Sequence, residues 1–320
     1  MVHRDRLNHR RQRALAIGTS LAGITAGAAI YARFVEPATL LVREIDLETP
    51  ALPASLDGMK IAFLSDMHLG GPAEFRTPVH QAMDTLHQAS PDIIMLGGDY
   101  FDRGVRAGSE PTWAEFPVIA PTFAVPGNHD YRGNPTNSSE IFSVLREAGI
   151  VVLRNESTSV PVRDSRISLI GLDDPYSERD DVHRAIRRNS DLTAFRVMLA
   201  HAGLVADRLP IDTADLILSG HTHGAQIRVS PFRRAGPLDI FWWLDRLKGN
   251  PLSPYRQGLF RVRGSLLYVG NGLGTTTVGA RFLAPPELAL FTLFSGKGNP
   301  ELQCDDPRRY IRQVRNSRKW

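Results

Sequence analysis

The chain has 320 residues, of which 42% are hydrophobic and 22% charged, a composition that indicates a globular protein with a sizeable core. Its single cysteine excludes a disulfide framework and a metal site built from several thiolates. The formal net charge of +4 would suit an anionic partner. The arginines gather at the two ends of the chain, however, and do not alternate with aromatic residues, so we expect no nucleic-acid partner.

Residues 1–35 predict a basic N-terminus followed by a membrane anchor or an export signal. A cluster of arginines precedes the uncharged run from Ala14 to Ala32, which is long enough to cross a bilayer. Arg10 and Arg11 suit a twin-arginine export signal, although the residues that usually surround such a pair are absent. A buried Ala-rich helix is the competing interpretation, which we disfavour because no polar face interrupts the run. The positive-inside rule then places the residues after Val35 at the cell membrane, outside the cytoplasm.

Three further segments follow this N-terminal region. Prolines punctuate residues 36–58, which we expect to be a linker with a first extended segment over Leu40–Leu47. Residues 59–295 form the folded domain in this interpretation. Residues 296–320 are rich in arginine and predict a basic C-terminal tail that is solvated or lies on a membrane surface.

Within residues 59–295, apolar runs predict strands that alternate with helices. Strands over Lys60–Ser65, Ile93–Leu96 and Thr122–Val125 alternate with helices over Thr77–Ala89 and Ser138–Ala148. Further short strands are predicted over Val151–Leu153, Ile167–Leu172, Val197–Ala200, Leu216–Ser219, Ile227–Val229, Leu266–Val269 and Leu288–Phe294. This order predicts an α/β protein in which two packed, mixed sheets form a sandwich flanked by helices, the first sheet being mainly parallel.

The stretch Pro91–Asp102 is the point around which we expect the domain to be organised. Ile93–Leu96 is an unbroken apolar run, typical of a strand buried on both faces, and two glycines end it. Asp99 follows these glycines directly. Ligands of open α/β sheets bind beyond the carboxyl ends of the strands, so a carboxylate here is placed where chemistry usually occurs. Taken alone, Asp99 is more simply interpreted as a turn residue.

Several other predicted strands also end in metal-binding residue types, and this repetition favours a functional interpretation. The full set of donors is Asp66, His68, Asp99, Asn128, His201, His221 and His223. Singly, each would more often be a turn residue or a hydrogen-bonded core histidine. Together they are too many for one tetrahedral zinc, and they suit two adjacent divalent ions that share a carboxylate.

These motifs resemble those of the calcineurin-like metallophosphoesterases. The similar segments are DMH at 66–68, GDYFD at 98–102, GNHD at 127–130, His201, and GHTH at 220–223. GLDDP at 171–175, GHTHGAQ at 220–226 and the glycine-rich segment around Asn271 are similar to the membrane-anchored or exported branch of that family. This branch includes bacterial phosphodiesterases and UDP-2,3-diacylglucosamine hydrolases of lipid A synthesis. The resemblance implies a four-layer fold of two sheets flanked by helices.

The resemblance also implies the roles of individual residues. Asp66, His68 and His223 would bind one metal, and Asn128, His201 and His221 the second, with Asp99 as the bridge. A hydroxide shared by the metals would attack phosphorus in line. His129, oriented by Asp102, would act on the leaving-group oxygen, although a purely supporting role for His129 is the alternative. The mixed imidazole and carboxylate donors suit Mn, Fe or Zn and do not suit calcium.

The substrate is predicted less directly. Residues 230–255 combine basic and aromatic side chains, which is typical of a membrane interface or of a site for an amphipathic phosphoester, but an ordinary surface loop explains the pattern equally well. From this segment and the loop near Gly274 we expect five substrate-binding residues: Arg233, Arg234, Trp242, Trp243 and Arg281. The substrate would then be a small-molecule or lipid-like phosphodiester or pyrophosphate.

Two alternatives to such an enzyme remain open at this point. The first is a phosphomonoesterase, and the second is a non-catalytic metal-binding scaffold anchored to a membrane. The presence of both His129 and Asp102 favours an enzyme, because a scaffold would need only the metal ligands.

Overall fold

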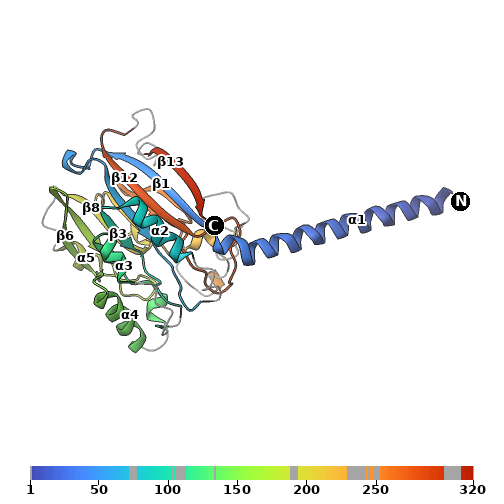
Figure 1. Ribbon diagram of the computed structural model, residues 1–320, viewed down its shortest axis with the longest axis horizontal. Helices are drawn as coiled ribbons and strands as arrows, with labels where there is room; N and C mark the ends of the chain where they lie inside the picture. Colours follow the sequence, from blue (N-terminus) through green and yellow to red (C-terminus); the bar gives the residue numbers. More distant parts are fainter. Residues whose placement is uncertain are drawn as a thin grey trace.

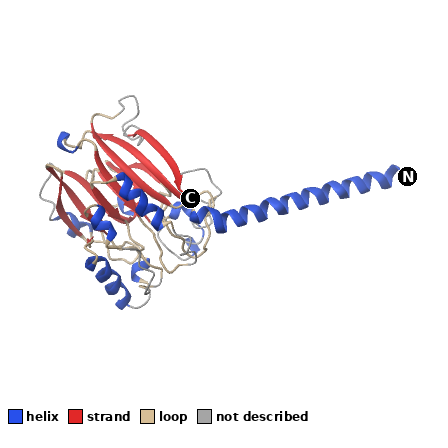
Figure 2. Cartoon of the chain, viewed as in Figure 1, coloured by secondary structure: helices blue, strands red, loops and turns tan. Residues whose placement is uncertain are grey.

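The computed structural model describes residues 2–71, 78–102, 104–105, 113–132, 135–187, 194–228, 243, 246–247, 253–298 and 311–319. A long N-terminal helix, α1 (Val2–Ile30), extends from a domain that contains two β-sheets (Figure 2). Helices cover the outer faces of both sheets, so the predicted α/β fold of two mixed sheets with flanking helices is confirmed.

The larger sheet has seven strands, in the order β13 (Ile311–Lys319), β1 (Leu40–Thr49), β12 (Glu287–Ser295), β2 (Met59–Leu64), β3 (Ile93–Leu96), β4 (Thr122–Ala124) and β5 (Val151–Val152). The four strands from β2 to β5 run parallel, as predicted for the first sheet. Strand β12 runs antiparallel to β2 and parallel to β1, and β13 runs antiparallel to β1 at the edge.

The smaller sheet has six strands, in the order β10 (Gly258–Val262), β11 (Ser265–Val269), β9 (Leu216–Gly220), β8 (Phe195–Ala202), β7 (Ser165–Gly171) and β6 (Glu156–Val162). Its four central strands are parallel, and the two outer strands are antiparallel to their neighbours.

Strand β3 shows how the layers are built. Ile93 and Met95 belong to the apolar core between the sheets, whereas Ile94 and Leu96 belong to the core on the outer face of the larger sheet. Because successive side chains on a strand point to opposite faces, burial on both faces requires the continuous apolar run seen in the sequence. The outer core is closed by α2 (Val79–Ala89), α3 (Glu115–Ile119) and α4 (Pro135–Glu147), while α5 (Val182–Arg187) packs on the smaller sheet.

The C-terminal segment differs from the sequence prediction, whereas the first extended segment agrees with it. Residues 296–320 were expected to form a basic tail, but Ile311–Lys319 is a strand that pairs with Leu40–Leu47 of β1. The expected first extended segment is confirmed as β1, which is an interior strand of the larger sheet. Strand β13 lies at the edge of this sheet, and it can carry many charges because its outer side meets water. Arg315 pairs with Glu44 at 3.0 Å across the two strands.

The N-terminal helix stands away from the body in Figure 1, and its described side chains are largely exposed. Among the described residues, one helical stretch, Leu15–Ala38, is long and apolar enough to cross a membrane. After α1, the chain reaches β1 through a π-helical turn, Tyr31–Val35, and a 3-10 turn, Glu36–Ala38.

Candidate active site

Five strands deliver the predicted metal-binding residues to one place. Loops after β2, β3 and β4 carry donors from the larger sheet, and the ends of β8 and β9 carry donors from the smaller sheet. All seven predicted side chains meet there: Asp66, His68, Asp99, Asn128, His201, His221 and His223. The strands that precede these loops are packed in the apolar cores, so the starting point of each loop is fixed.

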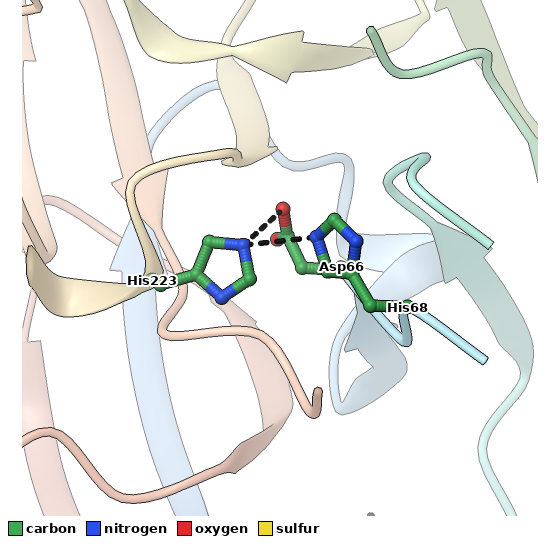
Figure 3. A group of neighbouring side chains, drawn as sticks. All are labelled: Asp66, His68 and His223. Carbon is green, nitrogen blue, oxygen red and sulfur yellow. Dashed lines mark hydrogen bonds and ion pairs between the residues drawn. The ribbon is translucent and has the colours of Figure 1, made fainter. Parts of the chain in front are cut away.

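The first group consists of Asp66, His68 and His223 (Figure 3). Asp66 and His68 lie in the loop after β2, and His223 lies in the loop after β9. Nε2 of His68 lies 3.0 Å from Nε2 of His223, and that nitrogen lies 3.5 Å from Oδ1 of Asp66. All three residues are buried. Burial, followed by the charge of His68, holds the pKa of His223 well below its usual value, which favours a neutral imidazole with a free lone pair.

The second group consists of Asp99, His201 and His221, with Asn128 beside them. Oδ1 of Asn128 lies 3.2 Å from Nε2 of His201 and 3.0 Å from Nδ1 of His221. The two imidazole nitrogens are 3.2 Å apart. Nδ1 of His201 is 2.7 Å from the carbonyl oxygen of Gly97, a contact that assigns a proton to Nδ1. Nε2 is then the nitrogen that can offer a lone pair to a metal ion.

Asp99 connects the two groups. Its Oδ2 lies 3.4 Å from Nε2 of His68 in the first group and 3.3 Å from Nε2 of His201 in the second. Its other carboxylate oxygen, Oδ1, accepts a hydrogen bond from the backbone N–H of His129. Burial opposes a charge on Asp99, but the neighbouring His201 and His129 outweigh it and hold the pKa of this carboxyl well below its usual value.

Backbone strain is concentrated in these loops. Five of the seven donors have positive φ angles: Asp66 at 52°, His68 at 46°, Asp99 at 58°, His221 at 71° and His223 at 51°. A side chain in this conformation costs about 1–3 kcal/mol and persists only where the surroundings impose it, most often at functional sites. The shared orientation of these donors therefore comes from strained turns beyond the strand ends.

The two predicted catalytic residues form a pair beside the first group. Nδ1 of His129 lies 2.9 Å from Oδ1 of Asp102, and the same carboxylate oxygen lies 3.5 Å from Nδ1 of His68. Burial lowers the pKa of His129, while the charge of Asp99 and the hydrogen bond to Asp102 oppose that shift. Burial also acts against the charge of Asp102, but its hydrogen bonds to His129 and His68 lower its pKa below the usual range.

Asp130, for which the sequence offered no role, holds the two loops together. Its buried carboxylate accepts backbone hydrogen bonds from Asp99 and Tyr100 at 2.9 Å and from Gly127 at 2.8 Å. Burial, followed by the charge of Asp99, raises the pKa of Asp130 to about 7. Asp130 therefore fixes the loop after β3 against the loop after β4.

Three residues at this site were missed by sequence reasoning. The ring of Tyr176 stacks on that of His221, with centroids 4.0 Å apart. The guanidinium of Arg132, an exposed residue, lies 3.2 Å from Nδ1 of His129, and Oγ1 of Thr276 lies 3.5 Å from Nε2 of the same ring. Tyr176 follows the GLDDP motif directly, which was the one signal that could have identified it.

The predicted substrate-binding residues fare differently. Arg233, Arg234 and Trp242 lie outside the described residues, and Trp243 is 47% exposed. Arg281 was expected to line the substrate cleft, but its side chain is fully buried. Its guanidinium donates to the backbone carbonyls of Gly272 and Ala284 and lies 3.3 Å from Nδ1 of His223, so it supports the site from behind.

Comparison with known proteins places this site in a family context. The family model described as calcineurin-like phosphoesterase matches residues 59–225, which carry all seven donors and both His129 and Asp102. The uncharacterized metallophosphoesterase YkuE of Bacillus subtilis is 30% identical over 298 residues, which cover 88% of this chain and 94% of the relative.

Two other relatives bear on activity and location. Phosphodiesterase YaeI of Escherichia coli is 29% identical over 245 residues, which cover 73% of this chain and 82% of that protein. A transmembrane protein with a metallophosphoesterase domain from Danio rerio is 29% identical over 286 residues, which cover 84% of this chain and 61% of the relative.

Proposed function

The chain belongs to the calcineurin-like phosphoesterase family and is a metal-dependent phosphoester hydrolase; from this premise we propose that it hydrolyses phosphodiester or pyrophosphate bonds with two divalent metal ions. The observation that carries the proposal is the position of Asp99, whose Oδ2 lies within 3.4 Å of a histidine from each donor group. One carboxylate shared between two sets of buried donors is the arrangement that a dinuclear site requires.

The donor atoms fit two such ions. In the first group two imidazole nitrogens face each other at 3.0 Å in a buried space, where at most one proton can lie between them, so a shared cation would satisfy both lone pairs. Asp66, His68 and His223 would hold one ion, and Asn128, His201 and His221 the other. The donors are nitrogen and oxygen atoms, which suit Mn, Fe or Zn. Bound divalent ions would offset negative charge on the phosphoryl oxygens and acidify water.

Within this proposal, His129 acts on the leaving group. Asp102 accepts a hydrogen bond from Nδ1–H and stabilises the imidazolium, so Nε2 is the atom that can donate a proton to a departing oxygen. Arg132 is an exposed cation beside the same ring and can contact a phosphoryl oxygen. Tyr176 holds the ring of His221 in place by stacking.

The relative that is named a phosphodiesterase supports this choice of bond class. For the alcohol side of the ester we propose a lipid-linked or nucleotide-linked group, supported by the apolar N-terminal helix and by the relative named a transmembrane protein. UDP-2,3-diacylglucosamine is one candidate of this class to be tested among others. We further propose that the helix anchors the chain in the cell membrane or directs its export, including through a twin-arginine signal, with the catalytic domain outside the cytoplasm.

Hydrolysis assays test this proposal directly. Purified full-length protein supplied with Mn²⁺ is assayed on bis-p-nitrophenyl phosphate and on p-nitrophenyl phosphate, with and without a chelator. We expect metal-dependent turnover of the diester that exceeds turnover of the monoester. Preference for the monoester would favour a phosphomonoesterase, and absence of turnover of either ester with metal bound would contradict the proposal. A screen of phosphorylated lipids and nucleotide sugars would then identify the substrate.

A further inference from the structure

The segment that directly follows α1, Tyr31–Ala38, is packed against the domain. Backbone N–H of Arg281 donates to the carbonyl oxygen of Ala32 at 2.8 Å, and Nη1 of Arg33 donates to the carbonyl oxygen of Gly279 at 2.8 Å. The buried carboxylate of Glu36 accepts the backbone N–H groups of Leu283 at 3.0 Å and Ala284 at 2.6 Å. These contacts fix the direction of α1 relative to a loop over residues 276–284, which we call the strap.

Large apolar side chains are exposed on both partners of this junction. Ile30 is 59% exposed and Phe34 58% on the helical side, while Val278 is 42% and Leu283 52% exposed on the strap. Phe34 and Val278 each neighbour, in sequence, a residue that makes a junction contact, Leu283 makes one itself, and Ile30 precedes Tyr31, whose ring meets that of Phe282 edge-on. We call these four residues the collar; Ile30 and Phe34 lie within the candidate membrane-crossing stretch Leu15–Ala38.

The strap is also strained at Leu283 and at the residue before Val278. Leu283 has a φ of 57°, and Thr277, which precedes Val278, has a φ of 58°. A branched or bulky residue in this conformation is unusual, and the exposure of the apolar Leu283 side chain to water gives no stabilisation that would offset the strain. Strain at an exposed apolar position indicates that the side chain meets another surface.

The strap reaches the active site as well. Its first residue, Thr276, lies beside His129. The side chain of Gln226 donates to the backbone carbonyls of Thr276 and Val278, and the guanidinium of Arg281 lies beside His223. The strap that carries Val278 and Leu283 therefore also contacts His129 and His223.

We propose that the collar sits in the headgroup layer of a lipid bilayer and holds the active-site end of the domain against the membrane. A helix that crosses the bilayer brings its base to the headgroup layer, and the rigid junction places the strap there too. Apolar side chains at this depth are stabilised by the edge of the acyl region. The inference rests on the proposed membrane anchor and does not depend on which bond the enzyme hydrolyses.

Site-directed fluorescence tests the position of the collar. Full-length protein carrying Cys304→Ser and one new cysteine, Leu283→Cys or Val278→Cys, is labelled with a fluorophore and reconstituted into vesicles of phosphatidylethanolamine and phosphatidylglycerol. Lipids that carry a nitroxide quencher at the headgroup are then added. Ile211→Cys is the matched control, because Ile211 is 68% exposed and precedes β9, at the end of that strand opposite His221.

We expect the labels at residues 283 and 278 to lose most of their fluorescence and the label at residue 211 to keep nearly all of it. Two positions are used because Leu283→Cys alters a strained turn and a misfolded variant would be uninformative by itself. Equal quenching at residues 278 and 211 would overturn the proposal. Release of the unmodified protein from the vesicles by alkaline carbonate would overturn it too, because the collar requires a helix that crosses the bilayer.

Discussion

Nδ1 of His129 lies 2.9 Å from Oδ1 of Asp102, and neither residue belongs to the two groups of donors joined by Asp99. The side chain of His129 can therefore be changed without removing a donor from either group, whereas Asp102 also contacts His68 of the first group. Residues that contact the leaving group should affect turnover, whereas residues that hold the ions should affect both metal content and turnover.

Replacing His129 tests the first half of this separation. We expect His129→Ala to retain both metals and to lower kcat by roughly 10²-fold to 10⁴-fold, the usual contribution of a positioned acid or base. Metal content is measured by elemental analysis and kcat with bis-p-nitrophenyl phosphate. His183→Ala, which removes an exposed histidine of α5, serves as the control and should match the unmodified protein. Unchanged kcat in His129→Ala would leave this residue with a supporting role only.

The partner carboxylate should have a smaller effect. Asp102→Asn keeps the size of the side chain but removes the charge that stabilises the imidazolium of His129. We expect kcat to fall by about 10-fold to 100-fold, as for outer residues that orient a ligand or catalytic group, with little change in KM. Steady-state kinetics separate the two parameters. A rise in KM with no change in kcat would show that Asp102 acts on substrate binding instead.

Asp130 should matter for stability. Asp130→Ala leaves three buried backbone N–H groups without their charged acceptor, so we expect the free energy of unfolding to fall by about 3 kcal/mol or more. Urea unfolding of the full chain in detergent micelles measures the change. Asp180→Ala is the control, because its ion pair with the exposed Arg208 should contribute no more than about 1 kcal/mol. Similar losses in the two variants would contradict the clamping role of Asp130.

Gly127 tests the close packing around the bridging carboxylate. A Cβ atom at this position would overlap the carboxylate and the backbone nitrogen of Asp99. Gly127→Ala should therefore displace Asp99 and weaken metal binding by about 10-fold to 100-fold. Gly203→Ala is the control, since a Cβ there meets only side-chain carbons at 3.2 Å or more. Titration with Mn²⁺ compares the two, and equal affinities would show that the loop adjusts without moving Asp99.

The sequence predicted the interior of this fold better than its edges. Strand β3 was found at its observed bounds because burial on both faces demands an uninterrupted apolar run. Strands β6, β10 and β13 were missed, since all three lie at sheet edges, where one side meets water and the alternation of apolar residues fades. For β13, arginines and a lysine made a paired strand resemble a tail.

The same contrast holds at the site. All seven predicted metal-binding side chains converge, because carboxyl ends of parallel strands meet at one end of each sheet. The stacking of Tyr176 on His221 could not be predicted, because it depends on how the loop after β7 lies against the loop after β9. The burial of Arg281 was hidden for a similar reason, because its partners are backbone carbonyls, which leave no pattern in the sequence.

The central claim is that one carboxylate, Asp99, serves two metal ions, and elemental analysis of Asp99→Ala tests it most directly. The unmodified protein purified with Mn²⁺ should contain two ions per chain. The variant should lose both together and should lose about 10³-fold or more in activity, because several kcal/mol of transition-state stabilisation disappear with the ions. A variant that retains two ions per chain would contradict the account.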